Sequence, residues 1–140
     1  MDRAQHIMRC MAILGPPWSQ VHDFLDQFFP QFGGEAHRIV LHHALGIELC
    51  VSRFGEAARA AANLHVKDDL GGVVPQGPQE VADGIEVWPD DLKTINRALA
   101  AFGWPEISLR RQRARERRAH RKMLSEACAK WMERDEDNPT

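Results

Sequence analysis

The stretch HRIVLHHALGIELCVSRFG, residues 37–55, decides the fold because it predicts a helix that carries three histidines. Apolar residues recur in it at the three- and four-residue spacing of one helix face. The predicted helix runs from about residue 35 to residue 54. A glycine pair precedes it, and Gly55 suits its C-terminal end because glycine adopts positive φ angles at low cost. His37, His42 and His43 therefore raise the question of whether this helix builds a chemical site or a polar core.

The same periodicity predicts helices on both sides of this segment. Ser19 can cap a helix that Pro30 stops, and Ser108 can cap the last helix. Residues 73–89 are rich in Pro and Gly, so we expect a loop there with one short extended segment. The predicted helices cover residues 2–14, 20–29, 35–54, 56–70, 90–102 and 109–134. The sequence thus predicts a single compact all-α domain of five or six helices with a long, partly projecting basic C-terminal helix.

Three parts of the chain are expected: a His-rich helical core at 1–107, the long basic and amphipathic helix at 108–134, and a polar tail at 135–140. The 140 residues fit one domain, and no apolar run reaches the roughly 20 residues that span a bilayer. The N-terminus lacks the basic-then-apolar layout of a signal peptide, so we expect a cytoplasmic protein with no membrane partner. Cys10, Cys50 and Cys128 are odd in number and widely spaced, which favours reduced core residues over disulfides.

Several histidines are paired with a second potential metal ligand four residues away. These pairs are His6 with Cys10, His22 with Asp26, and His65 with Asp69. Residues at this spacing share one helix face, so each pair could hold one metal ion. His42 and His43 are adjacent and point about 100° apart, so they cannot face the same spot as such a pair would.

Two interpretations of the histidines remain open. The first is a metal site in which one coordination position stays open for water. Its imidazole and carboxylate ligands would suit Zn, Fe, Mn or Ni. The second is a hydrogen-bonded polar core, which is the commoner role of a helical histidine. The candidate metal ligands are His37, His42, His43, His65 and Asp69, with His22, Asp23 and Asp26 as candidates that assist them. No residue is assigned as catalytic, because none of the serines or cysteines lies in a nucleophile turn.

One motif resembles a known family. The pattern His-Arg-x-x-x-His-His-x-x-Gly-x-x-Leu at 37–49, followed by Phe54-Gly55 and by His65-x-x-x-Asp69-Leu70-Gly71, resembles a family of small His-rich proteins of bacteria and phages that has no assigned activity. The resemblance covers roughly residues 4–75. It departs from the family at the alanine-rich segment EAARAAAN, and the C-terminal helices have no counterpart there. The resemblance implies that His37, His42, His43, His65 and Asp69 form one spatial cluster.

The charge of the chain is unevenly distributed. The net charge of −2 divides into −6 for residues 1–107, +7 for residues 108–122 and −3 for residues 123–140. The basic residues are spread around the whole circumference of the predicted helix, so this segment cannot be packed in a core. We expect it to bind an acidic protein surface, a nucleoprotein complex or nucleic acid, the alternative being a solvated helix. The candidate contacts are Arg110, Arg111, Arg113, Arg115, Arg117, Arg118, Arg121 and Lys122.

An apolar stripe follows the basic segment, formed by Met123, Leu124, Cys128 and Trp131, and it predicts that this half of the helix packs against something. Three functions follow as alternatives. The favoured one is a small interaction protein that binds through the basic helix; an inhibitor of a host-defence complex, encoded by a phage or mobile element, would fit it. The second is a metal-dependent hydrolase that uses the His/Asp cluster. The third is an oligomeric structural protein, for example a homodimer, with Trp131 in its interface.

Overall fold

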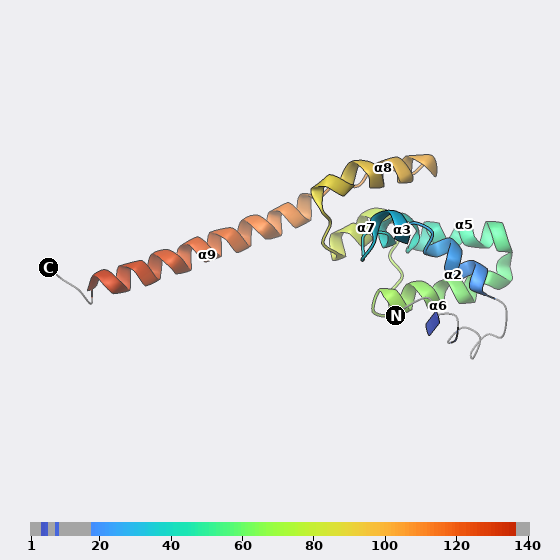
Figure 1. Cartoon of the computed structure of the whole chain (residues 1–140), viewed down its shortest axis with the longest axis horizontal. Coiled ribbons are helices and arrows are strands. Elements are labelled where there is room, and N and C mark those ends of the chain that lie inside the picture. The colour runs from blue at the N-terminus through green and yellow to red at the C-terminus, as the bar shows by residue number, and fades with distance from the viewer. Residues whose placement is uncertain (1–3, 6–7, 9–17, 137–140) are drawn as a thin grey trace. The chain divides into compact units, whose positions relative to one another are not determined.

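The computed structural model describes residues 4, 5, 8 and 18–136 and is helical throughout its regular elements (Figure 1). The predicted all-α class is therefore confirmed. The chain divides into two compact units, residues 1–108 and residues 109–140. The predicted first helix at 2–14, together with His6 and Cys10, falls largely outside the described residues. Within the described part of the chain, no helix has the length and apolar character needed to cross a membrane.

Among the described residues, the first unit contains seven α-helical segments, which is more than the five or six helices predicted for the whole chain. They are α2 (Ser19–Leu25), α3 (Phe29–Phe32), α4 (Arg38–Leu41), α5 (Ala44–Phe54), α6 (Arg59–Asp69), α7 (Pro78–Gly84) and α8 (Leu92–Ala101). Two 3₁₀ turns, η1 (Glu56–Ala58) and η2 (Pro89–Asp91), lead into α6 and α8. The extra helices arise where a predicted helix is interrupted and where a predicted loop is helical.

The core lies where α2, α5 and α6 pack against one another and where α4 packs against α5, α7 and α8 (Figure 1). Each helix contributes small or branched apolar side chains to it, which matches the predicted helix faces. The fully buried members include Val21, Leu25, Ile39, Val40, Leu41, Cys50, Ala61, Ala62, Val66, Ile95 and Leu99. Because α4 is only one turn long and is buried except for Arg38, its two ends lie inside the unit, and the histidines at those ends are buried too.

The predicted helix at 35–54 is broken at His42 and His43. His43 has an extended backbone and caps α5, because its Nδ1 accepts a hydrogen bond from the Gly46 amide at 3.2 Å. Gly46 also allows the two helices to meet closely: a Cβ atom there would lie 1.9 Å from the Leu41 carbonyl oxygen. The predicted end of this helix at Gly55 is confirmed, with a φ of 91° at that glycine.

Four further features differ from the prediction. Pro30 does not stop a helix but stands in the first turn of α3, where its missing amide hydrogen costs nothing. Ser19 is the first residue of α2 instead of its cap, and Leu109 separates Ser108 from α9. Residues 78–84 form α7, with Pro78 at its first position, although the segment 73–89 was expected to be a loop.

The second unit contains α9 (Arg110–Glu136), a helix of 27 residues that ends close to the predicted position. The predicted long basic C-terminal helix is therefore present. Its apolar stripe is exposed: the relative exposure is 59% for Met123, 50% for Leu124 and 65% for Trp131. The predicted packing of this half of the helix is thus not found among the described residues, and its large apolar side chains lie open to solvent.

Candidate metal centre

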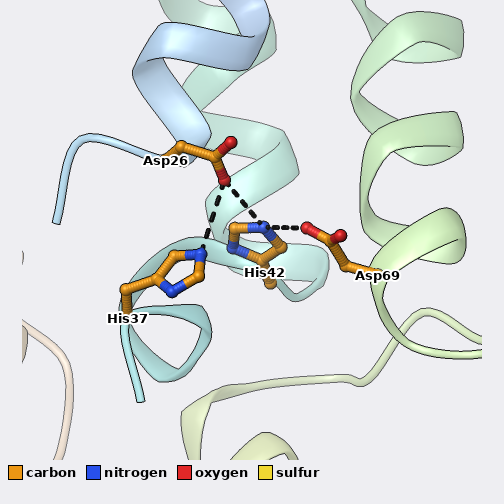
Figure 2. A group of neighbouring side chains, drawn as sticks. All are labelled: Asp26, His37, His42 and Asp69. Carbon is orange, nitrogen blue, oxygen red and sulfur yellow. Dashed lines mark hydrogen bonds and ion pairs between the residues drawn. The ribbon is translucent and has the colours of Figure 1, made fainter. Parts of the chain in front are cut away.

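Ends of three helices bring a group of histidines and carboxylates together (Figure 2). Asp26 is the residue that follows α2, and His37 and His42 flank the single turn of α4. His65 and Asp69 lie one turn apart near the end of α6, as their four-residue spacing predicts. The short, buried α4 is therefore what carries two of the histidines to the carboxylates of α2 and α6.

The donor atoms of these side chains converge on one point. Asp26 Oδ1 lies 3.0 Å from His65 Nε2, 3.3 Å from His42 Nε2 and 3.5 Å from His37 Nε2. His42 Nε2 is also 3.0 Å from Asp69 Oδ2 and 3.0 Å from His65 Nε2. The donor atoms of Asp26, His37, His42 and Asp69 all lie within 4.8 Å of one another. Neighbouring donors in a tetrahedral centre with bonds of about 2.0–2.1 Å stand about 3.3–3.4 Å apart, so the spacing fits a bound metal ion.

The cluster is almost closed to solvent. His42 and His65 are fully buried, His37 is 5% exposed, and the Asp69 side chain is 4% exposed. The Asp26 side chain, at 23%, is the most exposed of the group. Buried carboxylates are costly unless a positive charge or hydrogen bonds compensate them, so this site is built to hold positive charge.

Hydrogen bonds behind the donors fix the orientation of the rings. His37 Nδ1 lies 2.7 Å from the Gly34 carbonyl oxygen, which can only accept, so Nδ1 carries a proton and Nε2 faces the cluster. His65 Nδ1 lies 2.7 Å from His22 Nδ1, which leaves His65 Nε2 directed at the cluster. Arg38 donates to the Asp69 carbonyl oxygen at 3.2 Å, and its Nη2 lies 3.9 Å from Asp69 Oδ1. Such outer contacts are the usual means by which proteins orient metal ligands.

The ionisation of the cluster favours a bound cation. Burial raises the pKa of Asp26, but hydrogen bonds from His37, His42 and His65 outweigh it and hold the pKa well below its usual value. Burial lowers the pKa of His42, but hydrogen bonds to Asp26 and Asp69 outweigh it and raise the pKa above 6.5. The ionised Asp26 carboxylate thus draws positive charge to the centre, as protons on the histidines or as a metal ion.

His43 lies outside this cluster, contrary to the prediction that grouped it with the other ligands. Its Nε2 donates to the Val40 carbonyl oxygen at 2.9 Å, and its Nδ1 accepts from Gly46, so both ring nitrogens are occupied. Burial lowers the pKa of His43 to about 4. His43 is therefore a neutral, structural histidine, and the resemblance that implied its place in the cluster does not describe its contacts.

The three residues predicted to assist the ligands have different positions. His22 contacts His65 from behind, as an assisting residue would. Asp26 is nearer than predicted, since its carboxylate belongs to the converging donors themselves. Asp23 is exposed and lines a shallow groove with Phe24 and Arg53, away from the cluster. The four-residue spacing of His22 and Asp26 was a usable sequence signal, but it could not show which of the two belongs to the converging donors.

A cavity of about 380 Å³ borders the cluster at Asp69. Arg38, Glu35 and Glu80 supply its polar groups, while its other walls are mainly apolar and come from the segment after α6 and from α7. Asp69 belongs both to the cluster and to this cavity, which brings small molecules within reach of a ligand of the centre. The apolar lining residues are Leu70, Val73, Val74, Pro75, Val81 and Ile85.

The predicted partner-binding residues all lie on α9. Each of its eight basic side chains between positions 110 and 122 is exposed, and Lys122 lies 3.9 Å from Glu126 on the same helix. The predicted interface stripe is exposed on the same helix. Comparisons with protein-family models, curated proteins and solved structures found no match, so the function must be argued from these two sites.

Proposed function

We propose that the chain binds one divalent transition-metal ion through Asp26, His42, His65 and Asp69, with His37 as a further donor. The observation that carries this proposal is the convergence of two carboxylate oxygens and three imidazole Nε2 atoms at or near the ends of α2, α4 and α6, where six of the distances between these atoms are 3.0–3.5 Å. The mixture of imidazole and carboxylate suits Zn, Fe, Mn or Ni, as expected from the sequence. The buried setting and the outer hydrogen bonds of His37, His65 and Asp69 support it.

We further propose that the centre serves a metal-dependent hydrolase. A metal ion lowers the pKa of its bound water toward 7 and so supplies a hydroxide nucleophile at neutral pH. The cavity beside Asp69 would hold the substrate, with the Arg38 guanidinium placed to bind an anionic group in it.

The first test is elemental analysis of the untagged protein purified without chelator, followed by calorimetric titration of the apoprotein with Zn²⁺ and Mn²⁺. The wild type is expected to bind close to one ion, and Asp69→Asn, His42→Ala and His65→Ala to bind at least tenfold more weakly. The matched controls are Asp23→Asn, which changes an exposed carboxylate on α2, and His43→Asn, which changes a buried histidine beside the centre. Wild-type protein that binds neither ion, or ligand variants that bind like the controls, would make the cluster a hydrogen-bonded core.

The hydrolase is tested separately with metal-loaded protein. Hydrolysis of an activated phosphate ester and of an activated carboxylate ester should appear with bound metal and disappear with chelator. Loss of both activities on Arg38→Gln with metal binding retained is expected if Arg38 binds the substrate. A metal-loaded wild type that hydrolyses neither ester class would leave a metal-binding protein without this activity.

A second candidate function concerns α9, where eight exposed basic side chains fall within 13 residues. We propose that this segment, whose arginines begin two residues after Ser108, binds nucleic acid. The expected binding to duplex DNA weakens steeply with salt, because each neutralised phosphate releases a counterion. Changing Arg110, Arg111, Arg113 and Arg115 together to alanine should abolish it; binding that persists unchanged would reject this function and direct the search to acidic proteins.

A further inference from the structure

The exposed face of α9 has a regular pattern that extends beyond the apolar stripe. Starting from Leu124, steps of four and three residues reach Cys128 and Trp131, and the same steps backward reach Arg121 and Arg117. This alternation is the heptad spacing that keeps one helix face against a partner helix. We call the positions 117, 121, 124, 128 and 131 the seam. All five side chains are exposed.

Three of the five seam residues, Leu124, Cys128 and Trp131, are apolar, and such side chains gain free energy when a partner covers them. Leu124 is 50% exposed and Trp131 is 65% exposed. The side chains on the opposite face, Lys122 and Glu126, form an ion pair at 3.9 Å and leave that face polar. One face of α9 thus carries apolar side chains that a second helix can cover, and the opposite face is polar.

We propose that the seam pairs with the seam of a second copy of this chain, in an antiparallel two-helix coiled coil centred at residue 126. In this register Leu124 of one copy packs against Cys128 of its partner, and Arg121 lies against Trp131, where its guanidinium can contact the ring face. The turn at 116–119 has a net charge of +1 from Arg117, Arg118 and Glu116, and it lies beside residues 133–136 of the partner, which have a net charge of −2. The pairing is therefore complementary in charge at both ends.

A parallel pairing of the same helices is unfavourable on the same grounds. It would place Arg117 opposite Arg117 and Arg121 opposite Arg121, and would set two segments of net charge +7 side by side. The antiparallel arrangement separates these segments to the two ends. It also leaves residues 110–115 of each copy beyond the partner's helix end at Glu136, so both basic ends remain open for a nucleic-acid partner.

The test is made with the full chain. Light scattering should show a dimer, and Leu124→Ala and Trp131→Ala should each raise its dissociation constant at least tenfold. Met123→Ala is the matched control, because Met123 is 59% exposed on the same helix but lies off the seam. A monomeric wild type at all accessible concentrations overturns the proposal, as does a dimer that both seam variants leave unchanged.

Oxidative cross-linking then determines the orientation. A variant carrying both Leu124→Cys and Cys128→Ser is mixed with wild type, and the linked peptides are identified by mass spectrometry. The antiparallel register predicts a covalent heterodimer joined from position 124 to position 128, with no link between two wild-type copies at Cys128. Links between like positions, from 128 to 128 or from 124 to 124, would mean a parallel pair and would overturn the proposed register.

Discussion

In residues 18–108 five of the buried residues are histidines, whereas in α9 the large apolar residues Met123, Leu124, Trp131 and Met132 are exposed. Both patterns reverse the usual partition of side chains, and each has a specific reason. The buried histidines have hydrogen-bond partners within the unit, and these bonds offset the free-energy cost of burying polar side chains. The exposed apolar side chains on α9 are the ones that we propose a second copy of the chain to cover. The first unit is thus built around an internal site and α9 around an external surface.

The largest expected effect is a loss of stability in the first unit, caused by a substitution at Gly46. Gly46→Ala would place a Cβ atom 1.9 Å from the Leu41 backbone carbonyl, which no rotation of a side chain can relieve. We expect the free energy of unfolding of the first unit to fall by about 3 kcal/mol or more. Thermal unfolding followed by tryptophan fluorescence measures it, and the metal centre should be lost with the fold, because Gly46 holds the junction beside His42.

Gly84→Ala is the control for this prediction, since a Cβ atom at Gly84 meets nothing within 4 Å. It should change the free energy of unfolding by less than about 1 kcal/mol. Equal losses in the two variants would mean that any added methyl group is harmful and that the close approach at Gly46 is not the cause.

The role of Gly46 also shows where sequence reasoning reached its limit. Periodicity correctly predicted the helical class, the end at Gly55 and the pairing of His65 with Asp69, because these depend on neighbours within one turn. It continued one helix through His42 and His43, because the break depends on a capping bond and a close approach that no spacing reveals. α7 was missed because a seven-residue helix next to Pro and Gly has too short a pattern.

The candidate site was predictable to the same extent. His65, Asp69, His42 and His37 were named from sequence because histidines and acids are conspicuous in helical segments. Their convergence with Asp26 depends on how α2, α4 and α6 pack, which involves residues far apart in the chain. His43 was wrongly included because adjacent histidines look alike in sequence, although one ends α4 and the other caps α5.

The next effect compares one cysteine from each unit. Cys50 is fully buried, and burial raises the pKa of its thiol from 9.0 to about 11, whereas Cys128 is exposed. The thiolate is the reactive form, so alkylation of Cys50 by iodoacetamide at pH 8 should be at least about 100-fold slower than that of Cys128. Rates are read by mass spectrometry in the Trp131→Ala variant, in which a dimer does not cover Cys128. Comparable alkylation rates would mean that the first unit opens often enough for Cys50 to be as accessible as Cys128, and would contradict the prediction.

A smaller effect concerns the pH dependence of the first unit. The pKa of His43 is lowered to about 4 by burial, so as pH falls below 6.5 the unfolded chain takes up a proton before the folded one does. Stability from this residue is therefore complete above pH 6.5 and is lost as pH falls toward 4. Between pH 7 and pH 5 the loss should be about 2 kcal/mol relative to His43→Asn, which can still cap α5 but cannot titrate.

The measurement is denaturant unfolding of both proteins in the presence of chelator, so that metal binding does not enter. The comparison with His43→Asn is needed because His42 acts in the opposite direction: its raised pKa gives stability that is lost as pH rises. A difference between the two proteins that stays constant from pH 7 to pH 5 would mean that His43 does not titrate in this range when the protein is folded.

The smallest effect is expected on the face of α9 opposite the seam, which we call its outer face. Lys122 and Glu126 form an ion pair one turn apart, 3.9 Å long, with both side chains well exposed. Such pairs contribute at most about 0.5 kcal/mol, because water and salt screen them and both side chains lose freedom. Glu126→Gln should therefore leave the helix content, the stability of the first unit and the dimer unchanged within error, as circular dichroism and light scattering would record. Dissociation of the dimer on this substitution would show that the outer face of α9 makes the contact, and would move the partner surface away from Leu124 and Trp131.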